Sequence, residues 1–76
     1  MAKIRIMKQG YGDQCLLEYD ITNIDALNKA RSIFNENMSM GGRFAFRIDG
    51  DGETSLLDEF DETAEDILFC PAIQGG

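Results

Sequence analysis

The sequence contains no histidine, and only two of its 76 residues are cysteine. Histidine is the commonest general base in enzymes, the usual partner of a serine or cysteine nucleophile, and a ligand in most zinc sites. Its absence argues against hydrolysis by the side chains of this protein. We therefore expect a protein that is not an enzyme, with no catalytic residue, no metal site and no cofactor of its own.

Basic residues are also scarce. Seven lysines and arginines stand against fourteen aspartates and glutamates, which gives a net charge of −7. This charge would repel the phosphates of nucleic acids and the surface of anionic membranes, and it suits a basic cleft on a partner protein. No apolar run reaches transmembrane length, and the stretch MAKIRIMKQG lacks the apolar core of a signal peptide. We expect one cytoplasmic domain that binds neither nucleic acid nor membranes.

The two cysteines, Cys15 and Cys70, lie 55 positions apart and form no Cys-x-x-Cys motif. Each lies within an apolar stretch, where a cysteine usually behaves as a small buried hydrophobic side chain. We expect both thiols to be buried and reduced. A bond between them is not expected, because they belong to strands that should be separated in the sheet by more than the reach of a disulfide.

The beginning of the chain predicts a β-hairpin. Apolar and polar side chains alternate over residues 3–8 and again over residues 14–20. The segment 9–13 between them carries two glycines and an aspartate, which favour a turn. The side chains expected to face the core are Ile4, Ile6, Cys15, Leu17 and Tyr19.

A helical period replaces the alternation after Thr22, which we expect to cap a helix, with Asp25 completing a variant of the capping box. The helix should end near Met40, because Gly41 and Gly42 can adopt the left-handed conformation of a C-cap. One side of this helix is apolar and should pack on a sheet. Its apolar residues are Ala26, Leu27, Ala30, Ile33, Phe34 and Met38.

A third strand is expected over residues 43–49, where apolar side chains alternate with arginine and alanine. We expect Phe44, Phe46 and Ile48 to form a strongly aromatic inner face. The glycines and aspartates of segment 49–52 then predict a turn.

The last part of the chain predicts a short strand at residues 56–57, an acidic connection with Phe60 turned inward, and a final strand over residues 67–70. The final strand is apolar on both faces, which is typical of a strand in the middle of a sheet. Pro71 has no N–H to donate, so we expect regular pairing to weaken there.

Together these elements predict an α+β domain in which one helix packs across one face of a mixed sheet of four to five strands. The final strand should enter the centre of the sheet, parallel to the first strand, since this arrangement gives every apolar face a partner. The residues expected to form a single core between helix and sheet are Ile4, Ile6, Leu17, Leu27, Phe34, Phe46, Ile67 and Phe69.

The stretch DGDGETSLLDEF shares part of the pattern of a calcium-binding EF-hand loop. Acidic residues occupy its first, third and fifth positions, as Asp49, Asp51 and Glu53. Such loops also need glycine at the sixth position and glutamate at the twelfth, where this chain has Thr54 and Phe60. We interpret the stretch as a solvated acidic turn rather than a metal site.

The order of the elements and the end of the chain, DILFCPAIQGG, resemble the ubiquitin-like β-grasp family. The resemblance covers the whole chain in pattern. It is specific at the end, where an apolar strand is followed by Pro71 and then by Gly75 and Gly76. It implies a β-grasp domain over residues 1–71 and a flexible tail over residues 72–76.

The resemblance also implies that Gly76 is a reacting group. In this family an E1-like activating enzyme uses ATP to adenylate the terminal carboxylate, and Gly75 and Gly76 pass through its narrow channel because they have no side chains. Ala72, Ile73 and Gln74 would be the tail residues that this enzyme recognises. The acyl group then passes to a thiol as a thioester and on to target proteins, with a conjugating enzyme and a peptidase as further partners.

Two alternatives stay open at this point. A sulfur carrier would carry a C-terminal thiocarboxylate for the synthesis of a cofactor or a thionucleoside, whereas an adaptor or phage tail-assembly module would use the β-grasp fold alone. Carrier tails usually have two prolines, while here Cys70 precedes Pro71. This difference, and the long segment between the third and last strands, favour a modifier over a carrier.

Overall fold

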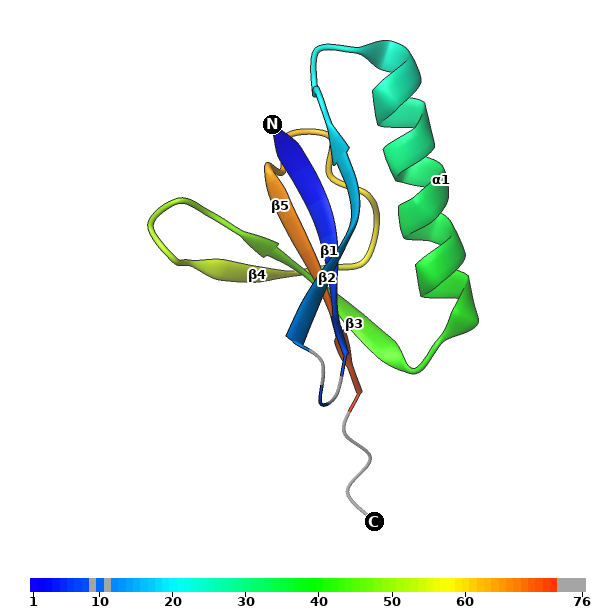
Figure 1. Ribbon diagram of the computed structural model, residues 1–76, viewed down its shortest axis with the longest axis vertical. Helices are drawn as coiled ribbons and strands as arrows, with labels where there is room; N and C mark the ends of the chain where they lie inside the picture. The colour runs from blue at the N-terminus through cyan, green and yellow to red at the C-terminus, as the bar shows by residue number, and fades with distance from the viewer. Residues whose placement is uncertain (9, 11, 73–76) are drawn as a thin grey trace.

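Figure 1 shows the computed structural model, which describes residues 1–8, 10 and 12–72. Within these residues the elements are β1 (Ala2–Lys8), β2 (Gly12–Tyr19), α1 (Ile24–Met40), β3 (Arg43–Ile48), β4 (Thr54–Leu57) and β5 (Asp66–Pro71). The five strands form one mixed sheet in the order β2-β1-β5-β3-β4, and α1 runs along one face of it (Figure 1). The expected α+β architecture is confirmed.

The central position predicted for the last strand is also confirmed. β5 pairs parallel with β1, where Ile67 lies beside Ile4, and antiparallel with β3, where Phe69 lies beside Ala45. Three consecutive residues of β5, from Ile67 to Phe69, are buried. Ile67 and Phe69 face the core beneath α1. Leu68 points to the opposite face, where it lies between Arg5 of β1 and Phe46 of β3.

The helix begins one residue later than its predicted cap. The side chain of Asn23 accepts a hydrogen bond from the backbone nitrogen of Ala26 at 3.1 Å, which makes Asn23 the N-cap. Thr22 is not the cap because its own N–H and hydroxyl donate to Oδ1 of Asp20, so it belongs to the turn before the helix. The end is as predicted, since the N–H of Gly41 donates to the carbonyl of Met38.

The core lies between α1 and the sheet. Its centre is Phe34, whose ring lies 5.4 Å from that of Phe69 and 5.8 Å from that of Phe60, which turns inward as expected. The buried members of the core are Ala2, Ile4, Tyr19, Ala30, Phe34, Ala45, Ala64, Ile67 and Phe69. Ile6, Leu17 and Leu27 pack against this cluster, as the sequence predicts.

The inner face predicted for β3 is wrong. Ala45 is fully buried on the side of α1, whereas Phe44 is 51% exposed and Phe46 is half-buried on the opposite side of the sheet, which we call the open face. The aromatic rings of Phe34 and Phe69 fill the layer between helix and sheet, so β3 contributes a small side chain there. Phe46 is therefore not part of the core.

Cys15 is exposed, although the alternation of β2 predicts a buried side chain. The pairing of β1 with β2 shifts register, because Ile4 lies opposite Leu17 while the next residue, Arg5, lies opposite Cys15. Leu16 is thus an extra residue, and this β-bulge turns Cys15 to the open face. Cys70 is half-buried, and both thiols are free, as predicted.

Pairing continues past Pro71, contrary to expectation. Pro71 lies opposite Arg43, and the N–H of Ala72 donates to the carbonyl of Gly42 at 2.9 Å. In antiparallel sheets, hydrogen-bonded pairs alternate with pairs that exchange no hydrogen bond. Because Ala72 and Gly42 form a bonded pair, Pro71 occupies a position where no N–H is needed toward β3.

This packing predicts a clear difference between two phenylalanines. Phe34→Ala should lower the free energy of unfolding by about 3–5 kcal/mol because it leaves a cavity at the centre of the core. Phe44→Ala, at a side chain that is 51% exposed, should lower it by less than about 1 kcal/mol. Urea denaturation measures both values. Equal losses for the two variants would contradict the assignment of inner and open faces.

Candidate functional site

The activation site predicted from the sequence comprises residues 72–76. Of these the structure describes Ala72, which is half-buried and held to Gly42 by its backbone hydrogen bond. Ile73, Gln74, Gly75 and Gly76 lie outside the described residues. The central strand therefore fixes the position of the backbone at the point where the predicted tail begins.

Arg5 of β1 links three strands of the sheet, one of which is the central strand β5. Its guanidinium donates from Nε and Nη2 to both carboxylate oxygens of Asp66 on β5, at 3.0 and 2.9 Å, and from Nη1 to Asp13 on β2, at 2.6 Å. The hydrogen bond to Asp66 is the main reason why the pKa of Arg5 is raised. Such a two-pronged contact fixes both position and orientation. It ties β1 to both of its neighbours.

Arg47 holds the acidic connection between β4 and β5 in a similar way. It donates to Asp49 at 2.8 Å, to Asp61 at 2.7 Å and to the hydroxyl of Thr63 at 2.8 Å. Asp61 also accepts hydrogen bonds from the hydroxyl and backbone N–H of Thr63. These two bonds, followed by the contact with Arg47, lower the pKa of Asp61. The ion pairs and hydrogen bonds of Arg47, Asp61 and Thr63 hold the acidic connection against β3.

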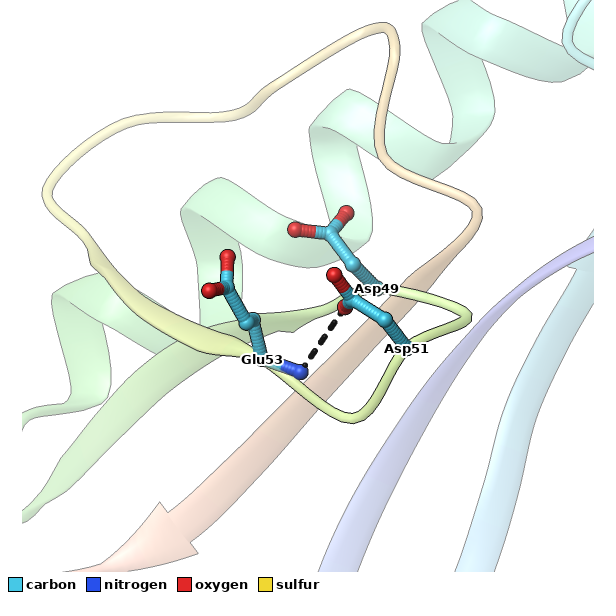
Figure 2. A group of neighbouring side chains, drawn as sticks. All are labelled: Asp49, Asp51 and Glu53. Atoms are coloured by element: carbon cyan, nitrogen blue, oxygen red, sulfur yellow. Dashed lines mark hydrogen bonds between the residues drawn. The ribbon is translucent and has the colours of Figure 1, made fainter.

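The acidic cluster of Asp49, Asp51 and Glu53 lies in the turn between β3 and β4 (Figure 2). Carboxylate oxygens from the three residues lie within 4.8 Å of one another. Asp51 accepts a hydrogen bond from the backbone of Glu53 at 3.0 Å, and Asp49 accepts one from Arg47. Two of the three carboxylates thus stabilise the turn itself, which supports its interpretation as an acidic turn.

The turn is closed by its backbone as well. The N–H of Asp49 donates to the carbonyl of Glu53, and the N–H of Gly52 donates to the carbonyl of Asp49, each at 2.9 Å. Gly52 has a φ of 88°, a conformation that a residue with a β-carbon adopts only with strain. At the twelfth position of the calcium-loop pattern, Phe60 packs in the core and cannot act as an oxygen ligand.

A hollow of about 470 Å³ lies along the end of β4 and is lined by residues 56–62. Its walls combine apolar and acidic side chains, including Leu56, Phe60 and Glu62. Arg31 from α1 lies 5.7 Å from the centre of the Phe60 ring and pairs with Glu62. The sequence does not predict this hollow, because it depends on how the acidic connection folds back on the helix.

The open face of the sheet was also missed, since alternation shows that a strand has two faces without showing which one the helix covers. Phe44 and Leu56 are 51% and 58% exposed there. No helix within the described residues is both long and apolar enough to cross a membrane.

The hydrogen bonds of Asp61 predict a pH-dependent contribution to stability. The folded state lowers the pKa of this carboxyl, so its contribution is fully present above the ordinary aspartate value of about 3.9 and disappears as the pH falls through the folded value. Asp61→Asn should lower the free energy of unfolding by about 1–2 kcal/mol at neutral pH and by much less at low pH.

Urea denaturation at neutral pH and near pH 2 checks this expectation. Glu59→Gln is the matched control, because Glu59 is an exposed acid on the same connection and should give almost no difference at either pH. A loss at Asp61 that is the same at both pH values would contradict the role assigned to its charge.

No family model matches the sequence, and neither a curated protein nor a solved structure matches this chain.

Proposed function

We propose that this chain is a ubiquitin-like β-grasp protein modifier. In this proposal the carboxylate of Gly76, present as a natural end or released by a peptidase, is adenylated by an activating enzyme that uses ATP. The acyl group then passes to a thiol and finally to target proteins. The Gly75-Gly76 pair after the last strand suggests this chemistry, and the arrangement of the sheet supports it.

The observation that carries the proposal is the place of β5. It lies between β1 and β3, parallel to β1, and the single helix of the described residues packs across one face of the sheet. This arrangement is compatible with a β-grasp fold. The hydrogen bond between Ala72 and Gly42 anchors the chain at the end of the central strand. An enzyme that handled the following residues would thus grip a short segment next to a rigid domain.

Each step of the proposed chemistry has a defined balance of bonds. A carboxylate oxygen of Gly76 attacks the α-phosphorus of ATP, and pyrophosphate leaves. A thiolate then attacks the carbonyl carbon and displaces AMP, which gives a thioester. A lysine amine of the target displaces the thiol and forms an amide. The activating enzyme would recognise residues 72–74. The two glycines would fit through its narrow channel because they have no β-carbon.

Deletion of Gly76 should leave the melting temperature nearly unchanged and abolish ATP-dependent transfer. The assay combines the tagged protein with ATP and an extract of the cells that make it, followed by electrophoresis with and without thiol reductant and by mass spectrometry. The unaltered chain should give an adduct that reductant removes and further adducts that resist it. Gly50→Ala is the control, since Gly50 has no positive φ and a β-carbon there meets nothing within 4 Å.

Other outcomes of this assay point to other functions. A mass increase that matches sulfur in place of oxygen at the terminus would replace the modifier by a sulfur carrier. Absence of any ATP-dependent species, or a lower melting temperature after deletion of Gly76, would contradict the proposal and favour an adaptor that uses the fold alone.

A further inference from the structure

The open face carries a continuous apolar surface. β-Strands turn alternate side chains to opposite faces, and the register places those of β1, β5, β3 and β4 side by side. We call the following set the apolar strip: Met7, Phe44, Phe46, Ile48, Leu56, Leu68 and Cys70. Because α1 covers the other face, nothing within the described residues packs over the strip as a layer (Figure 1).

The pairing shows that the strip is contiguous. Phe46 lies opposite Leu68 on one side and opposite Leu56 on the other, and Phe44 lies opposite Cys70. Directly paired side chains in a sheet have β-carbons about 4.5–5.5 Å apart, so these side chains contact one another across three strands. They form one surface rather than scattered positions.

Three members of the strip are exposed to an extent that packing within the domain does not explain, although Leu68 between them is buried. Met7, Phe44 and Leu56 are 42%, 51% and 58% exposed. The other strongly exposed apolar residues that belong to secondary structure, Ile24 and Met40, lie at opposite ends of α1 and are separate from each other. Contiguous exposed apolar surface on a small protein marks a site of interaction.

The segment that borders the apolar strip at β4 carries charge of one sign. The eight acidic residues between positions 48 and 66 are accompanied by no lysine or arginine in that segment, which forms the turn, β4 and the acidic connection. Arg47, immediately before it, is already bonded to Asp49 and Asp61. On the other side of the apolar strip, Arg5 is bonded to Asp13 and Asp66. Lys3 lies on the same face of β1, opposite Glu18 of β2 and Asp66 of β5. The border of the strip along β4 is therefore negative, while acidic and basic residues face each other along β1.

This charge selects among possible occupants. A second copy would bring two chains of net charge −7 together at their acidic sides, and the phosphates of a nucleic acid or an anionic membrane would be repelled. A basic and apolar protein surface would match both the centre and the border.

We propose that the apolar strip is a docking surface for a partner protein whose own apolar side chains are bordered by lysine or arginine. Leu56 lies where the apolar strip meets the hollow of residues 56–62, because it belongs to the strip and also lines the hollow. The inference does not depend on the chemistry of Gly76 and stands whether or not that residue reacts.

The test uses a short synthetic peptide in which leucine and phenylalanine are flanked by lysines, together with a twin peptide that carries glutamate in place of each lysine. Nuclear magnetic resonance titration of the full chain gives both the dissociation constant and the residues that respond. The lysine peptide should shift the signals of Phe44, Phe46 and Leu56, and added salt should weaken its binding. The glutamate twin should not bind.

Two matched pairs of variants distinguish binding at the apolar strip from a general electrostatic attraction of the peptide to an acidic protein. Leu56→Ser should raise the dissociation constant at least about tenfold, whereas Ile24→Ser, at a 73% exposed apolar residue of α1, should leave it nearly unchanged. Glu59→Lys should weaken binding more than Glu36→Lys, which changes the net charge equally on the helix. The dispersed spectrum of each variant shows that it is folded.

Several results would overturn the inference. These are equal weakening by Leu56→Ser and Ile24→Ser, binding of the glutamate twin, or signal shifts confined to α1. A dimer in sedimentation equilibrium that Leu56→Ser dissociates would make a second copy the occupant instead. Deletion of Gly76 should leave binding unchanged, so failure here and failure of the transfer assay are distinguishable.

Discussion

The position of β5 between β1 and β3 is the constraint on which the rest of this structure depends. β5 is the sole bridge between the hairpin of β1 and β2 and the hairpin of β3 and β4 in the described sheet. Its side chains Ile67 and Phe69 meet Phe34 of α1, so the same strand that joins the two hairpins also closes the core beneath the helix. Burial of these apolar groups stabilises the sheet and the helix together.

The ion pairs follow from this placement. Asp66, the first residue of β5, forms an ion pair with Arg5 of β1. Asp61, in the connection before β5, forms an ion pair with Arg47 of β3. These carboxylates thus balance arginines on both neighbours of the central strand. The acids that remain lie mostly in the turn after β3 and along the acidic connection. A charge distribution of this kind acts on the choice and approach of partners more than on the fold.

Much of this fold could be predicted from the sequence because the signals were local. The apolar stripe at helical spacing predicted the helix, and the final run that is apolar on both faces predicted the central strand. The inner face of β3 could not be predicted, because alternation leaves open whether Ala45 or the phenylalanines face the helix. Cys15 was misplaced because a bulge at Leu16 depends on pairing with β1. Of the predicted tail site, only Ala72 lies within the described residues.

The bulge at Leu16 also bears on how the molecule avoids growing into a larger sheet. β2 is an edge strand of eight residues, and an unbroken edge of that length offers free backbone donors and acceptors to any strand that approaches. An extra residue in its middle breaks the spacing of these groups and increases the local twist, so a foreign strand cannot stay in register across it. The opposite edge, β4, has only four residues. Protection against strand-by-strand aggregation is thus built into both borders of the sheet.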